Sequence, residues 1–147
     1  MSNDAARIAE LSLQGFCCSQ VLALMGLELM GTNSPELVRA MMGLCGGIGS
    51  SGATCGALTG GVCVLHLFAG KGAPEEKVDF QLGLMTSELI EWFTAENTAS
   101  YGGILCREIL AGNPMHQRTR CPQLVVATWE KVKEILLANG YPRARGR

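Results

Sequence analysis

Apolar residues recur every three or four positions along this chain of 147 residues, and that spacing is the strongest constraint on its fold. The clearest stripe lies in the segment 74–96 and is formed by Val78, Leu82, Met85, Leu89 and Trp92. Residues at this spacing share one face of a helix, whereas a half-buried strand needs a period of two. No segment has a period of two that competes with the helical pattern, so the sequence predicts an all-α protein.

Capping and turn-forming residues divide the pattern into six or seven helices. They are expected at residues 4–14, 16–30, 34–44, 55–69, 74–96, 103–111 and 121–139. Asn3 and Ser34 are suitable N-caps, and glycines such as Gly15 and Gly31 follow the helix ends. A glycine-rich loop at 45–54 precedes the central helix. We expect a single compact helical redox domain over residues 1–140, followed by a basic tail at 141–147.

Composition and charge exclude several classes of protein. Hydrophobic residues make up 48% of the chain and charged residues 17%, which excludes intrinsic disorder. The net charge of −1 provides no field for binding a nucleic acid backbone. No charged residue occurs between Arg39 and Lys71, but glycines, serines and threonines interrupt this stretch. It therefore predicts a buried helix and no membrane span, and any apolar patch left on it would make a homodimer plausible.

The chain has seven cysteines, and because this number is odd they cannot all pair within one chain. The N-terminal residues do not resemble a signal peptide, so a cytoplasmic location is expected. In that compartment cysteines favour metal binding or redox chemistry over structural disulfides. No pair has the C-x-x-C spacing.

Four of the cysteines lie in or near the first turns of separate predicted helices: Cys18, Cys55, Cys106 and Cys121. Free backbone N–H groups and the helix dipole favour an anion at such positions, so these thiols should have a lowered pKa. If the four helix starts converge, they form a pocket for a thiolate cluster. The N–H groups would help offset the net charge of −2 of a Cys-ligated [2Fe–2S]²⁺ centre.

The remaining cysteines have simpler interpretations. Cys45 and Cys63 are expected to pack as small apolar residues. Cys17 should point away from its neighbour Cys18 and act as a spectator. His116 could ligate a metal or lower the pKa of Cys121, or it could be a solvated loop histidine. The sequence Gly47-Ile-Gly-Ser-Ser-Gly52 satisfies G-x-G-x-x-G, but no strand precedes it and no acidic residue follows at the required distance, which argues against a dinucleotide site.

The ordered cysteines also resemble the C_GCAxxG_C_C family of redox-active proteins. The matching elements are Cys18-Ser-Gln-Val-Leu, Cys55-Gly-Ala-Leu-Thr-Gly60, Cys106-Arg-Glu-Ile-Leu and the isolated Cys121. The resemblance covers about residues 8–138. It implies that Cys18, Cys55, Cys106 and Cys121 are the functional set, and that the chain is similar to the non-haem part of split-Soret cytochromes, where an iron–sulfur centre is expected. The extra cysteines, at 17, 45 and 63, also allow alternative disulfides.

Three functions follow from these observations. The first is a redox protein in which Cys18, Cys55, Cys106 and Cys121 bind an iron–sulfur cluster, [2Fe–2S] or a related metal centre, and exchange single electrons with a partner protein. The second is a thiol–disulfide redox protein in which Cys55 is the attacking thiolate. The third is a helical interaction protein whose cysteines only pack. The sequence does not decide between an oxidoreductase and an electron carrier.

Overall fold

Eight α-helices and one short 3₁₀ helix make up the regular structure of residues 3–143, the part of the chain described by this computed structural model. They are α1 (Asn3–Leu13), α2 (Cys18–Met30), α3 (Pro35–Met41), η1 (Met42–Leu44), α4 (Gly56–Ala69), α5 (Leu82–Tyr101), α6 (Cys106–Leu110), α7 (His116–Thr119) and α8 (Cys121–Ala138). No strand occurs among these residues, which confirms the all-α prediction. The helix count exceeds the expected six or seven because the sequence pattern does not reveal the short α7.

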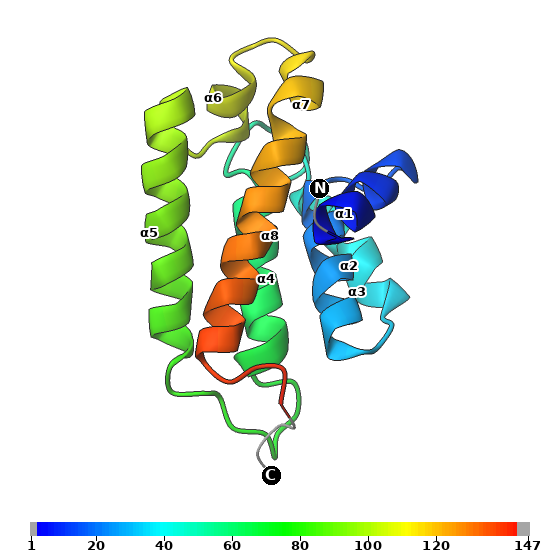
Figure 1. The fold of residues 1–147 in the computed structure, drawn as a ribbon, viewed down its shortest axis with the longest axis vertical. Helices are drawn as coiled ribbons and strands as arrows, with labels where there is room; N and C mark the ends of the chain where they lie inside the picture. Colours follow the sequence, from blue (N-terminus) through cyan, green and yellow to red (C-terminus); the bar gives the residue numbers. More distant parts are fainter. Residues whose placement is uncertain (1–2, 144–147) are drawn as a thin grey trace.

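Helix α4 is the centre of the fold and packs against α2, α5 and α8. Helices α2, α4 and α8 run in the same direction, and α5 runs opposite to them (Figure 1). The starts of these three helices therefore lie toward the end of the molecule where α6 and α7 are found (Figure 1). Helices α1 and α3 flank α2. This arrangement brings several helix N-termini to one region.

The core is built from large apolar side chains on α2, α4, α5 and α8. Its most fully buried members include Leu22, Leu65, Leu89, Phe93 and Trp129. Each of these side chains contributes about 1.5–3 kcal/mol through removal from water.

Both ends of the described chain are attached to this core. Near the N-terminus, the Asp4 carboxylate accepts a hydrogen bond of 3.0 Å from Trp129 Nε1 and pairs with Lys133. Near the C-terminus, the Tyr141 hydroxyl donates to Asp79 Oδ2 at 2.7 Å, and Arg143 Nη2 lies 2.6 Å from the same oxygen. The predicted basic tail begins with Tyr141, which is buried against the core. Residues 144–147 lie outside the described part of the chain.

Helix boundaries follow the local signals where those signals are strong. Ser34 caps α3 as predicted, because its hydroxyl accepts from the Leu37 N–H at 3.3 Å. Gly31 ends α2 with a positive φ of 80°. The helix predicted at 74–96 is displaced: α5 begins at Leu82, Val78 is exposed, and the helix continues to Tyr101.

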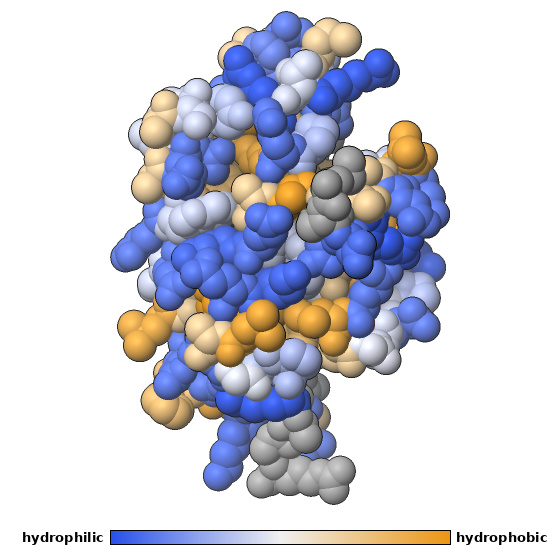
Figure 2. All heavy atoms as spheres, viewed as in Figure 1, coloured by the Kyte–Doolittle hydropathy of each residue, from blue (hydrophilic) through white to orange (hydrophobic). Residues whose placement is uncertain are grey.

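Polar side chains cover most of one face of the molecule, with apolar side chains exposed in smaller groups (Figure 2). Within residues 3–143, no helix has the length and hydropathy needed to cross a membrane.

Candidate four-cysteine site

The four cysteines singled out by the sequence all lie at helix starts. Cys18, Cys106 and Cys121 are the first residues of α2, α6 and α8, and Cys55 is the N-cap of α4. The placement of the four cysteines in first turns is confirmed, although α2 and α6 begin two and three residues later than predicted. The N-cap of α8 is Arg120, the residue before Cys121.

The four thiols lie close enough to influence one another electrostatically. A charge on Cys106 raises the pKa of Cys18, and charges on Cys18 and Cys121 raise the pKa of Cys55. Cys121 is affected in the same way by Cys18 and Cys106. Cys18 thus lies within electrostatic range of the other three thiols.

Two glycines of the C-G-A-x-x-G segment explain how the cysteines approach. A Cβ placed on Gly56 would lie 2.5 Å from Cys18 Sγ, and one on Gly60 would lie 2.9 Å from the Ser19 Cα. Both contacts are closer than a side chain permits, so only glycine allows α4 to pack this tightly against the start of α2. The spacing of four places both glycines on one face of α4. That close packing brings Cys55 next to Cys18.

The glycine-rich loop forms a left-handed turn beside the thiols. Residues 46–50 all have positive φ angles, including Ile48 at 62°. The Gly46 N–H acts on the Cys18 sulfur and lowers its pKa. A Cβ on Gly47 would lie 2.8 Å from Cys106 Cβ, so the loop also contacts the start of α6. The backbone of this loop therefore lies against both Cys18 and Cys106.

Two backbone hydrogen bonds connect the segments that carry Cys55 and Cys106. The Cys55 N–H donates to Ile104 O at 2.9 Å, and the Cys106 N–H donates to Ala53 O at 2.7 Å. They form an isolated antiparallel bridge between Thr54 and Leu105. This bridge fixes the separation of the two cysteines, although α4 and α6 begin 50 residues apart in the sequence.

Burial, and not the helix dipole, decides the protonation of these thiols. Burial raises the pKa of Cys55 to about 12 and that of Cys121 to about 11. The N–H groups of Ala57 and Leu58 lower the pKa of Cys55, as the helix-start argument predicts, but the cost of burying the charge is larger. The prediction of lowered pKa values was therefore wrong. Cys55 is only 6% exposed and is not a reactive thiolate in this form.

The donor set fits a centre of positive charge. Cys55 is buried and the other three cysteines are half-buried, and backbone N–H groups act on the sulfurs of Cys18 and Cys55. The thiolate forms need a cation to offset their burial, which iron supplies when sulfur ligates it. In the described ranges, no group of three or more His, Cys, Asp or Glu side chains has the arrangement of a ready-made site for one metal ion.

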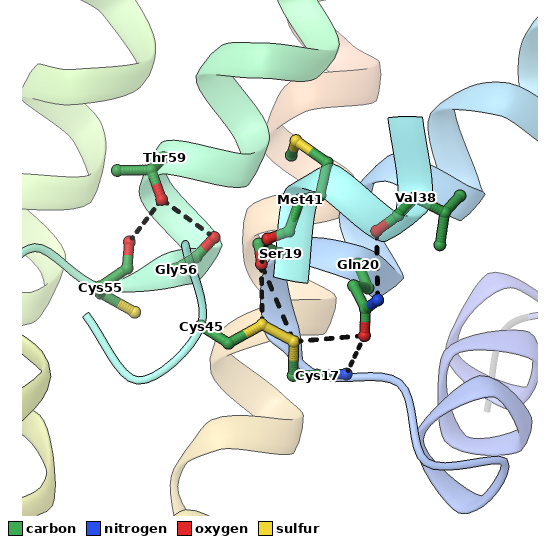
Figure 3. The surroundings of a disulfide bond; sticks show 9 residues. All are labelled: Cys17, Ser19, Gln20, Val38, Met41, Cys45, Cys55, Gly56 and Thr59. Atoms are coloured by element: carbon green, nitrogen blue, oxygen red, sulfur yellow. Dashed lines mark hydrogen bonds between the residues drawn. A yellow bond between two sulfur atoms is a disulfide. The ribbon is translucent and has the colours of Figure 1, made fainter. Parts of the chain in front are cut away.

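A disulfide joins Cys17 to Cys45 beside this site (Figure 3). Their Cα atoms are 6.1 Å apart. The predictions that Cys17 is a spectator and that Cys45 only packs were therefore wrong. Cys17 is the N-cap of α2 and Cys45 follows η1, so the packing of α3 and η1 on α2 brings them together. No local spacing marks this pair, because 28 residues separate them.

Cys63, the two histidines and Arg120 have surroundings of their own. Cys63 is half-buried and borders a small apolar cavity with Ala23 and Met41. His66 is exposed on α4. His116 is half-buried, and its Nδ1 lies 2.6 Å from Leu110 O, so it is not a freely solvated loop histidine. Arg120 donates to Ile109 O at 2.7 Å and lies over the Tyr101 ring.

Fold and site together define a small all-helical protein with four convergent cysteines and a neighbouring disulfide. The chain belongs to the family described as "Putative redox-active protein (C_GCAxxG_C_C)", which matches residues 16–135. That match confirms the resemblance drawn from the cysteine motifs. No curated protein and no solved structure matches the chain.

Proposed function

We propose that this redox protein binds an iron–sulfur cluster, of the [2Fe–2S] type, through Cys18, Cys55, Cys106 and Cys121. The observation that carries the proposal is the packing of these helix starts against one another: a Cβ on Gly56 would lie 2.5 Å from Cys18 Sγ, and the Thr54–Leu105 bridge holds Cys55 close to Cys106. When bound, such a centre supplies reversible one-electron transfer.

The chain's own residues set the conditions for that chemistry. The four cysteines lose their protons when they ligate the centre. Because the pKa values of Cys55 and Cys121 are high, binding of the centre should depend strongly on pH. The N–H groups near Cys18 and Cys55 stabilise negative charge on sulfur, and burial restricts water. These factors govern the potential of a sulfur-ligated centre.

The two alternative functions receive less support. A thiol–disulfide mechanism with Cys55 as nucleophile requires an accessible thiolate, whereas Cys55 is buried and its pKa is raised to about 12. A role in which the cysteines only pack does not account for four thiols gathered at helix starts. An electron carrier of this type needs a redox partner protein, and its free thiols suit a reducing compartment such as the cytoplasm. Homodimer formation stays a prediction.

Iron binding by cysteine variants tests the ligand set. We expect Cys18→Ser, Cys55→Ser, Cys106→Ser and Cys121→Ser each to lose bound iron after anaerobic reconstitution. Cys63→Ser is the matched control, because Cys63 is also half-buried but lies outside the site; it should retain the iron. Loss of iron from Cys63→Ser together with retention in Cys55→Ser and Cys121→Ser would contradict the assignment.

A further inference from the structure

We infer that Cys17 and Cys45 form a second redox site, a reversible disulfide that a protein dithiol opens by thiol–disulfide exchange. This site is distinct from the four-cysteine site and uses none of its sulfurs. It would take up two electrons and two protons, whether or not the other site binds iron.

The position of the disulfide suits exchange with another protein. Cys17 and Cys45 are both half-buried, in contrast to Cys55 in the core. Cys45 lies where η1 ends and the left-handed turn begins, and Met42 and Ile48 nearby are exposed. A partner thiol therefore approaches from the surface, without opening the core.

Each sulfur has an oxygen nearby that can accept a thiol hydrogen once the bond is reduced (Figure 3). Ser19 Oγ lies 2.9 Å from Cys45 Sγ, and Gln20 Oε1 lies 3.4 Å from Cys17 Sγ. In the disulfide neither sulfur carries a hydrogen, so neither is a donor.

The same polar groups also have partners in the oxidised form. The Ser19 hydroxyl donates to Met41 O at 2.7 Å, and Gln20 Oε1 accepts from the Cys17 N–H at 3.3 Å. The Gln20 amide donates to Val38 O at 3.1 Å. An oxygen can accept a further hydrogen while keeping these bonds. The surroundings therefore satisfy both the disulfide and the dithiol, as a reversible couple requires.

The placement of Cys17 indicates the direction of attack. Cys45 lies between the exposed Met42 and Ile48, whereas Cys17 Sγ lies 3.4 Å from Oε1 of the buried Gln20. Cys45 is therefore the sulfur that a partner reaches, and Cys17 is the leaving group. A thiolate of the partner attacks Cys45 Sγ, forming a mixed disulfide and releasing Cys17 as the thiolate. The partner's second thiolate then attacks its own sulfur in the mixed disulfide and releases Cys45. Both released thiolates take a proton from solvent, and the partner's dithiol is oxidised to a disulfide.

Differential alkylation with peptide mapping tests the site. The folded protein is incubated with a reduced thioredoxin-type dithiol protein, and the thiols of residues 17 and 45 are measured. We expect both to become alkylatable while the helical circular dichroism is unchanged, and the bond to re-form with oxidised glutathione. Resistance of the bond until denaturant is added would overturn the inference and make the disulfide purely structural. Because the readout concerns only residues 17 and 45, this result is independent of iron binding at the other four.

The direction and the hydrogen-bond argument have separate tests. A dithiol protein lacking its second cysteine should be trapped on Cys45, and trapping on Cys17 would overturn the proposed direction.

Ser19→Ala should shift the equilibrium about fivefold toward the disulfide, since one hydrogen bond to the reduced form is lost. Thr128→Val is the matched control, because Thr128 is an equally buried hydroxyl that donates to Leu124 O at 2.7 Å. An equal shift in both variants would contradict the role of Ser19.

Discussion

At the scale of single residues, the contact between Gly56 and the Cys18 sulfur explains why a glycine directly follows Cys55. A Cβ added to Gly56 would also lie 3.0 Å from Leu44 O, so backbone and sulfur both exclude a side chain. The sequence identified Cys18 and Cys55 but gave no reason for the glycine between Cys55 and Ala57. The reason is a contact between helices that only the folded chain contains.

We expect Gly56→Ala to destabilise the fold by about 1–3 kcal/mol, because the added methyl group overpacks the start of α4. Urea unfolding measures this change, and iron content should fall in parallel. Gly83→Ala is the control: Gly83 lies exposed in α5 with no heavy atom near its Cβ position, so stability should rise by about 0.5–1 kcal/mol. Equal effects of both substitutions would contradict the close packing of Cys18 on α4.

The buried thiols also predict a pH dependence of the metal-free, folded chain. The pKa of Cys55 is raised from 9.0 to about 12, so its neutral form stabilises the fold fully below pH 9. Above pH 9 the unfolded state loses its proton first, and this stability is lost between pH 9 and about 12. Between pH 8 and 10 the contribution of Cys55 to the free energy of unfolding falls by about 1.4 kcal/mol.

Urea unfolding at several pH values, with the disulfide intact, measures this dependence. Cys55→Ser removes the titrating group, so its stability should decrease less steeply above pH 9 than that of the unsubstituted chain. The slope, and not the absolute stability, is the readout, because serine also changes packing. Identical slopes for the two proteins would show that the Cys55 thiol is not buried as described.

At the scale of elements, local signals predict some boundaries and fail at others. Ser34 and Gly31 are identified from the sequence because capping depends on neighbouring residues. The start of α5 is misplaced because the helical spacing includes Val78, whereas the segment before α5 is held by tertiary contacts. There, the Asp79 N–H donates to Ala69 O at 3.0 Å, and its carboxylate accepts from the Gln81 N–H at 2.9 Å.

The left-handed turn at 46–50 supports a prediction about Ile48. A β-branched residue with a φ of 62° is strained, and relief of a left-handed conformation gains about 1–2 kcal/mol. Ile48→Gly should therefore be more stable than Ile48→Ala by about 1 kcal/mol, since both lose the same exposed side chain but only glycine relieves the strain. Thermal unfolding of the two variants checks this order. Greater stability of the alanine variant would contradict the left-handed turn.

At the scale of the whole molecule, the parallel course of α2, α4 and α8 brings their N-termini together. The sequence predicts the helices and the four cysteines at their starts, but helical periodicity alone does not determine how the helices are arranged. It also misses the Cys17–Cys45 pair, because seven cysteines allow many pairings and the two lie in different segments. The raised pKa values are likewise not predicted, because burial depends on packing that no local pattern reveals.

The most direct test of the central claim is analysis of protein expressed with ample iron and purified without oxygen. We measure its visible absorption together with its iron and acid-labile sulfide. The account predicts a coloured protein with two irons and two sulfides per chain, all lost when Cys55 or Cys121 is replaced by serine. A colourless protein that contains no iron, and takes up none on reconstitution with iron and sulfide, would contradict it.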